Sequence, residues 1–161
     1  TRTIDSKKKL TQLEKDKYEP LLINILPESL VKLVKKCQLN PLISKNILYH
    51  KYSNMTVLFS DIVSFTNYSS FTLAVDVVKM LNEYFTCFDS LAEFYGVEKV
   101  KTIGDAYFAI CYNAANNASR ITQFAYKMME FSNKSRYGFK MRVGCATGEG
   151  ITTVLGDLRF K

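Results

Sequence analysis

The spacing of apolar residues divides the chain into a helical first third and a mixed region after it. In residues 10–34, leucine, isoleucine and valine recur every three or four positions between charged residues, as in amphipathic helices. Pro20 and Pro27 interrupt this pattern and suit the first turns of new helices. We therefore expect residues 1–50 to form a helical linker or dimerisation segment, with a separate domain beginning near Lys51.

The second region opens with a strand-like run and a helical pattern. Residues 55–62 are a short apolar run rich in strand formers, which predicts a strand buried on both faces. Apolar residues at intervals of three and four then predict one long helix over residues 69–93, ended by Gly96.

The remaining pattern completes a sheet. Residues 97–103 and 106–112 predict a hairpin, residues 116–132 a second helix, and residues 139–147 a fourth strand, followed by a glycine-containing turn and residues 151–155. The order β-α-β-β-α-β predicts an α+β fold of the ferredoxin-like kind, with the helices on one face of the sheet.

The net charge of +7 is concentrated in the first third, where ten Lys and Arg face five Asp and Glu. Because these lysines alternate with apolar residues at helical spacing, they indicate a solvated helix face rather than a nucleic-acid site. No run of apolar residues is long enough to span a membrane, and no signal peptide is visible. Since the chain begins with Thr1, we expect a fragment, and a membrane segment elsewhere in the parent protein stays open.

Cysteine and histidine usage excludes several chemistries. The four cysteines form no C-x-x-C pair, and the chain holds a single histidine. Zinc sites and histidine-based triads are therefore hard to assemble. Reduced thiols in a cytoplasmic domain fit best.

Two aspartates are candidates for metal chemistry. Asp61 ends the first predicted strand and Asp105 occupies the hairpin turn, which this topology brings beside that strand end. Neighbouring carboxylates favour a cation between them, and oxygen ligands suit Mg²⁺ or Mn²⁺. Each aspartate also fits an ordinary cap or turn position, so the residues alone leave both interpretations open.

Three ordered motifs carry a family resemblance. The runs F-S-D-I-V-S-F-T, K-V-K-T-I-G-D-A-Y-F-A and M-R-V-G-C-A-T-G resemble the catalytic domain of class III nucleotidyl cyclases. The earlier run L-L-I-N-I-L-P-E-S-L resembles the helical linker upstream of that domain. The resemblance implies a catalytic domain over residues 51–161 that lacks its C-terminal part, since further base-reading and transition-state residues of the family would follow Lys161. We accordingly expect the isolated fragment to be inactive.

The resemblance also implies a reaction and its metal ligands. Asp61 and Asp105, with the carbonyl of Ile62, would hold two Mg²⁺ or Mn²⁺ ions. The ribose 3′-oxygen of ATP or GTP would attack the α-phosphate and pyrophosphate would leave. Arg142 would contact the triphosphate.

Further positions match groups that bind the substrate. The amides of Ser64, Phe65 and Thr66 would contact the phosphates, although the family more often has glycine at position 64. At the position of Lys101, adenylate cyclases resemble this chain in having lysine, whereas guanylate cyclases usually have glutamate. The lysine therefore slightly favours ATP as the substrate. Family sites form between two domains, so we expect a homodimer or a paired heterologous domain. In an unequal pair this lysine need not read the base, and GTP stays open.

Three alternatives accompany this interpretation. One is a non-catalytic regulatory module with a cyclase-like fold. A second is a polymerase-type palm or diguanylate cyclase, and a G-G-[DE]-[DE]-F hairpin is absent from the sequence. A third is an RNA-binding sheet, but the run A-Y-F-A-I-C-Y lacks the basic, glycine-flanked pattern of such domains. We expect no nucleic-acid partner.

Overall fold

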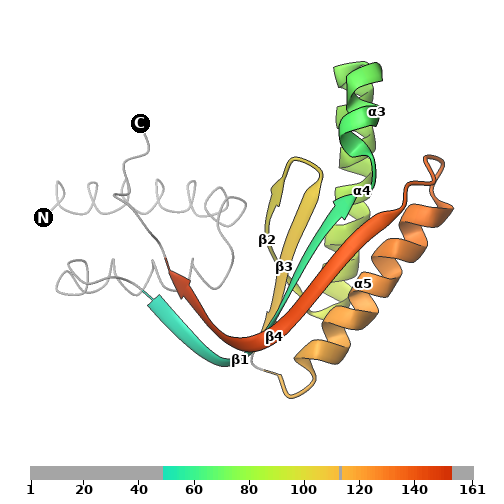
Figure 1. Ribbon diagram of the computed structural model, residues 1–161. Coiled ribbons are helices and arrows are strands. Elements are labelled where there is room, and N and C mark those ends of the chain that lie inside the picture. The colour runs from blue at the N-terminus through green and yellow to red at the C-terminus, as the bar shows by residue number, and fades with distance from the viewer. Residues whose placement is uncertain (1–48, 113, 154–161) are drawn as a thin grey trace, which may run out of the picture. The chain divides into compact units, whose positions relative to one another are not determined.

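The computed structural model describes residues 49–112 and 114–153, so nearly all of the expected helical linker lies outside the described part. Lys51–Ile151 form one compact unit. The elements follow the predicted order, with one additional short helix (Figure 1). They are β1 (Tyr49–Ile62), α3 (Phe65–Phe71), α4 (Ala74–Tyr95), β2 (Glu98–Ile103), β3 (Ala106–Tyr112), α5 (Asn117–Lys134) and β4 (Met141–Thr153).

The four strands form one sheet in the order β2-β3-β1-β4. β3 pairs antiparallel with both β1 and β2, and α4 and α5 cover one face of the sheet (Figure 1). This arrangement confirms the predicted α+β sheet. Its core is contributed mainly by the two long helices, through the buried side chains of Met80, Tyr84, Phe88, Ile121, Phe124 and Met128.

Strand β1 is buried on one face only, so the prediction of burial on both faces is wrong. Leu58 and Ile62 are buried against the helices, whereas Phe59, which points the other way, is 48% exposed. The continuous apolar run arises because apolar residues also line the face that α4 and α5 leave open. We call this the open face of the sheet.

The predicted single helix over residues 69–93 is two helices. The hydroxyls of Ser69 and Ser70 both donate to the carbonyl of Thr66, which competes with the helical backbone at the end of α3. Thr72 and Leu73 are then extended, and the Leu73 carbonyl accepts the first hydrogen bonds of α4. The predicted stop is confirmed: Gly96 caps α4 with φ 60°.

Strand β4 continues where a glycine-containing turn was predicted. Gly148 and Gly150 lie inside the strand and are not among the glycines with positive φ. A Cβ atom at Gly150 would lie 1.9 Å from the Met55 side chain, so glycine here allows close approach rather than a turn. Across β1 and β4, the hydroxyls of Thr56 and Thr147 are hydrogen-bonded at 2.9 Å.

No helix within residues 49–112 and 114–153 combines the length and the apolar character that crossing a bilayer requires.

Candidate active site at the end of the sheet

Asp61 and Asp105 lie at the same end of the sheet. Asp61 is the penultimate residue of β1, and Asp105 is in the turn between β2 and β3. Because β3 neighbours β1, this turn lies beside the end of β1. One carboxylate oxygen of Asp105 accepts a hydrogen bond at 3.0 Å from the amide of Ile62, the residue that follows Asp61 in the sequence. This bond holds Asp105 at the end of β1.

The turn that carries Asp105 depends on a glycine. Gly104 has φ 61°, in the left-handed region that other residues enter at a cost. No atom lies within 4 Å of a Cβ built at Gly104, so backbone conformation rather than crowding requires glycine. The turn directs Asp105 back to the Ile62 amide.

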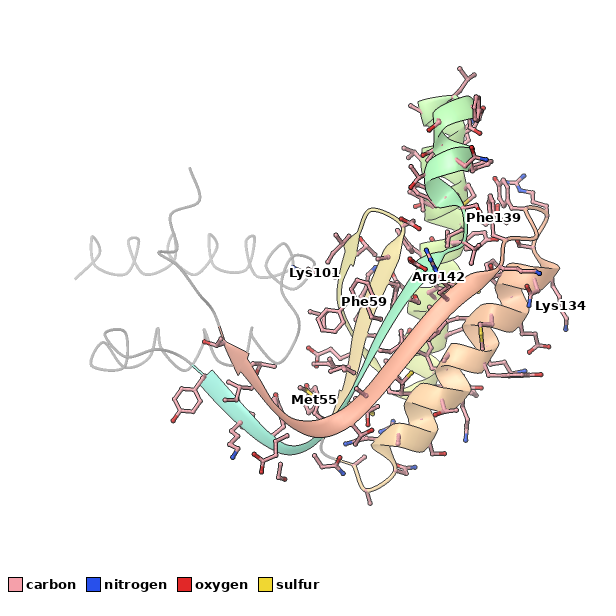
Figure 2. The ribbon with its side chains drawn as sticks, in the orientation of Figure 1. Met55, Phe59, Lys101, Lys134, Phe139 and Arg142 are labelled. Atoms are coloured by element: carbon pink, nitrogen blue, oxygen red, sulfur yellow. The ribbon has the colours of Figure 1, made fainter. Side chains whose placement is uncertain are left out.

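Arg142 approaches Asp61 from the opposite side, on β4. Its Nε and Nη2 atoms donate to the two carboxylate oxygens of Asp61, each at 2.8 Å. This is the paired geometry in which a guanidinium binds carboxylate or phosphate most strongly. The Arg142 side chain (Figure 2) is 70% exposed and that of Asp61 34%, so the pair faces solvent.

The charges of both aspartates act on Arg142. The hydrogen bonds that Arg142 donates to Asp61, and the negative charge of Asp61, raise the pKa of Arg142, and the charge of Asp105 raises that pKa further. The two carboxylates and the guanidinium therefore form one electrostatic cluster. In it, Arg142 occupies the oxygens of Asp61 that the sequence analysis assigned to a metal ion.

The loop after β1 has an unusual backbone at Ser64. Ser64 has φ 63° and is the one residue other than glycine with positive φ in the described part of the chain. It precedes α3, and its hydroxyl makes no capping hydrogen bond. The Val63 amide donates to the Lys140 carbonyl at 2.9 Å, which ties the loop to the start of β4. Phe65 and Thr66 open α3.

Lys101 stands on the open face, away from the carboxylates. It pairs with Phe108 of β3, and Phe108 in turn contacts Phe59 with ring centroids 6.0 Å apart. Lys101 is exposed and makes no hydrogen bond or ion pair with the described residues. From the usual distance between neighbouring strands and the usual rise per residue, the Cα atom of Lys101 lies about 12 Å from that of Asp61.

The ligand set fits a divalent cation that arrives with phosphates. Among the described residues no three His, Cys, Asp or Glu side chains come together as a ready metal site. Asp61 and Asp105 supply two carboxylates and Ile62 a backbone carbonyl, and a cation would have to displace Arg142 from the oxygens of Asp61. Mg²⁺ is typically bound by one or two carboxylates, with water and substrate phosphates completing its coordination, so these residues fit it.

The sequence analysis did not identify the ion pair between Asp61 and Arg142. The two residues are 81 positions apart, and the resemblance placed Arg142 against substrate phosphates only. The order of the strands could have indicated it, because β4 lies beside β1 at the end where Asp61 stands.

Fold and site together define an α+β domain with an acidic, arginine-containing site at one end of a sheet, beside the face that the helices of the described residues leave open. Residues 47–161 match the family model described as the adenylate and guanylate cyclase catalytic domain. The chain belongs to this family.

The relatives of the chain include both adenylate cyclases and guanylyl cyclases. The chain is 32% identical over 156 residues to an adenylate cyclase of Mycobacterium bovis, covering 92% of this chain and 34% of the relative. It is 32% identical over 154 residues to a membrane guanylyl cyclase of Dictyostelium discoideum, covering 89% of this chain and 10% of the relative. It thus spans about a third or less of the length of these curated relatives.

A solved structure gives the same comparison in three dimensions. The guanylate cyclase domain of RhGC from Catenaria anguillulae, in complex with GTP, superposes with a TM-score of 0.62 at 35% identity, covering 68% of this chain and 64% of that one. Similarity is therefore comparable toward adenylate and guanylate cyclases.

Proposed function

We propose that this domain converts a purine nucleoside triphosphate, with ATP slightly favoured, into a 3′,5′-cyclic nucleotide and pyrophosphate. One observation carries the proposal: Asp61, Asp105 and Arg142 converge at one sheet end in a chain of the cyclase family. The proposed setting is a cytoplasmic domain in cyclic-nucleotide signalling, within a protein that is either free or membrane-attached.

The carboxylates and the arginine have separate roles. Asp61, Asp105 and the Ile62 carbonyl hold two Mg²⁺ or Mn²⁺ ions, which when bound acidify the ribose 3′-hydroxyl and neutralise the triphosphate. Arg142 contacts the triphosphate through the same paired N–H groups that now bind Asp61, because phosphate and carboxylate oxygens present similar geometry.

Phosphate contacts also come from the loop after β1. The amides of Ser64, Phe65 and Thr66 are proposed to donate to phosphate oxygens. The left-handed conformation of Ser64 supports this proposal, because backbone of this kind presents consecutive amides to anions in many proteins. No nucleophilic side chain is needed, because the ribose oxygen is the attacking group.

A second cyclase domain, identical or heterologous, is proposed to cover the open face. Phe59 is 48% exposed and Ile103 is 51% exposed, and α4 and α5 cover the other face of the sheet (Figure 1). Exposed apolar side chains on a sheet face commonly mark an interaction surface. Lys101 lies on the same face, where a lysine donating to a purine ring nitrogen favours ATP. GTP as substrate is the alternative, supported by the guanylyl cyclase relatives.

Nucleotide binding tests this function. We expect Mn²⁺-dependent binding of a nonhydrolysable ATP or GTP analogue, measured by calorimetry, that is lost in Asp61→Ala and Asp105→Asn. Asp76→Ala is the matched control, because Asp76 is an exposed aspartate of α4 paired with Lys79. Failure of the unchanged chain to bind either analogue would instead support a non-catalytic regulatory module.

The reaction itself is tested with the chain paired with a second cyclase domain. Separation of the products from ATP or GTP should give a cyclic nucleotide and pyrophosphate. Oligonucleotide products would support the polymerase-type alternative and contradict the proposal.

A further inference from the structure

The loop that connects β1 to α3 contacts the start of β4 on both of its sides. Before the loop, the Val63 amide donates to the Lys140 carbonyl at 2.9 Å. After it, the ring of Tyr68 meets the ring of Phe139 edge to face, with the ring centroids 4.9 Å apart. Lys140 and Phe139 are consecutive residues. Residues 64–67 therefore run between two contacts with one short piece of chain.

Tyr68 is also joined to the loop through the backbone. Its amide donates to the carbonyl of the left-handed Ser64 at 3.0 Å. Helix α3 has seven residues, none of them buried, and helices of this length are not stable without tertiary packing. Phe65 and Tyr68 are the residues of α3 that pack against the core. The position of α3, and of the loop before it, therefore depends on these two side chains.

Phe139 is held firmly by the two long helices. Its carbonyl accepts a hydrogen bond at 2.6 Å from the hydroxyl of Ser132, a buried residue of α5. Its ring also contacts the rings of Tyr84, which is buried on α4, and Tyr137. Figure 2 shows Phe139 at the end of the sheet where α3 begins. Phe139 thus gives Tyr68 a fixed surface to pack on.

Arg142 follows Phe139 closely but lies on the opposite face of the sheet. Phe139 packs against the core, as do Met141 and Val143, two and four positions further on. Arg142 lies between the last two and is exposed, as the alternation of a strand requires. One short segment therefore carries both the ring that holds the loop and the guanidinium that is proposed to bind the triphosphate.

We propose that Tyr68 and Phe139 are positioning residues for the triphosphate, because their ring contact holds the loop in place relative to Arg142. This inference rests on the proposed nucleotide-cyclase function, in which the amides of residues 64–66 and the guanidinium bind phosphate oxygens. Groups that are already in place bind more tightly, since ordering a loop during binding costs affinity. The two rings act through the loop, without contact to the nucleotide. All of these groups belong to one chain, so the effect does not require the second cyclase domain.

Binding of tripolyphosphate tests this role, because tripolyphosphate presents the phosphates without ribose or base. Its Mn²⁺ complex is titrated into the chain by calorimetry, and Mn²⁺ alone is titrated separately. In Tyr68→Leu we expect the dissociation constant of the Mn²⁺–tripolyphosphate complex to rise by about two- to tenfold, which is the range that the energy of an aromatic pair allows. Binding of Mn²⁺ alone should not change, because Asp61 and Asp105 lie on β1 and in the turn after β2, outside α3.

Three further variants isolate the ring contact. Tyr68→Phe is the matched control, because it keeps the ring and removes only the hydroxyl, and its tripolyphosphate affinity should equal that of the unchanged chain. Phe139→Leu removes the same contact from the other side, so adding Tyr68→Leu to it should weaken binding no further. Phe131→Leu removes an aromatic contact with Tyr84 elsewhere in the core. It should lower the melting temperature without changing tripolyphosphate affinity.

The outcomes separate this role from general stability. Equal tripolyphosphate affinity of Tyr68→Leu and the unchanged chain overturns the positioning role, and so does an equal loss of affinity in Tyr68→Phe or in Phe131→Leu. Tyr68 is only partly buried, so the comparison of its leucine and phenylalanine variants decides the question even if Phe139→Leu does not fold.

The same titrations distinguish the positioning role from the proposed function. Loss of the positioning role alone leaves Mn²⁺-dependent tripolyphosphate binding by the unchanged chain intact. Absence of that binding in the unchanged chain overturns the proposed function itself, and the positioning role with it.

Discussion

Replacement of Arg142 by glutamine should change metal binding in opposite directions with and without nucleotide. In the nucleotide-free chain the guanidinium occupies both oxygens of Asp61, so a metal ion must displace it. With nucleotide present, Arg142 can transfer to the triphosphate, and its positive charge then supports binding. The same side chain therefore competes with free metal and assists the metal–nucleotide complex.

The structure sets the size of both effects. The pair is bidentate but largely exposed, and couplings of exposed ion pairs correspond to factors of about 1.5 to 5 in an equilibrium constant. Arg142→Gln should accordingly strengthen nucleotide-free Mn²⁺ binding by about three- to fivefold. Loss of a charged hydrogen bond to phosphate should weaken binding of the Mn²⁺–nucleotide complex by about tenfold or more.

Free Mn²⁺ can be quantified by electron paramagnetic resonance in titrations with and without a nonhydrolysable analogue. Lys140→Gln is the control for loss of a nearby charge, since Lys140 is exposed two residues before Arg142. Arg136→Gln is the control for loss of an exposed ion pair elsewhere. Unchanged or weaker nucleotide-free Mn²⁺ binding in Arg142→Gln would refute the competition between arginine and metal.

Three further predictions concern the stability of the fold. Ser64 has φ 63°, a conformation that glycine adopts readily and a β-branched residue does not. In urea denaturation, Ser64→Gly should therefore raise the free energy of unfolding by up to about 1 kcal/mol, and Ser64→Val should lower it by about 1–2 kcal/mol. Gly96→Ala should cost about 1–2 kcal/mol in the same assay, since φ is 60° and the new Cβ would overlap the Arg120 side chain. Burial first, and then the hydrogen bond to Asp89, raise the pKa of Tyr107, so its hydroxyl stays protonated in the folded chain while it ionises near pH 10 in the unfolded chain. Its contribution is therefore complete below about pH 10 and is lost as pH rises further, and Tyr107→Phe should show a shallower loss of stability between pH 9 and pH 11.

Apolar periodicity predicted the element order because each long helix has one face on the core. Tyr84 and Phe88 of α4, and Phe124 and Met128 of α5, are buried at helical spacing. The pattern gave a wrong prediction of burial where apolar residues lie on an exposed face of the sheet. Phe59 extends the apolar run of β1 but faces outward, so composition alone could not distinguish one buried face from two.

The approach of Asp105 to the end of β1 was predictable from topology, because the order of elements places the hairpin turn there. The β-bulge between Lys99 and Lys101 was not predictable, since it depends on one unpaired residue in β2. Lys99 and Lys101 have the spacing of residues on one strand face, and only the register with β3 separates them. The pairing of Arg142 with Asp61 likewise depends on β4 lying beside β1.

Three departures from regular backbone surround the candidate site, and each directs a proposed site residue. The left-handed Ser64 follows the strand that carries Asp61, the left-handed Gly104 precedes Asp105, and the bulge at Val100 precedes Lys101. A regular hairpin would offer alternate faces only, so it could not turn one residue back to the neighbouring strand end and send another to the open face. Such irregularities persist where the surrounding structure fixes them. Here the Ile62 amide binds Asp105, and the carboxylate of Asp89 on α4 binds Lys99 and Tyr107 on either side of the bulge. Metal binding should therefore respond to a substitution at Gly104, even though glycine has no side chain that could touch the nucleotide.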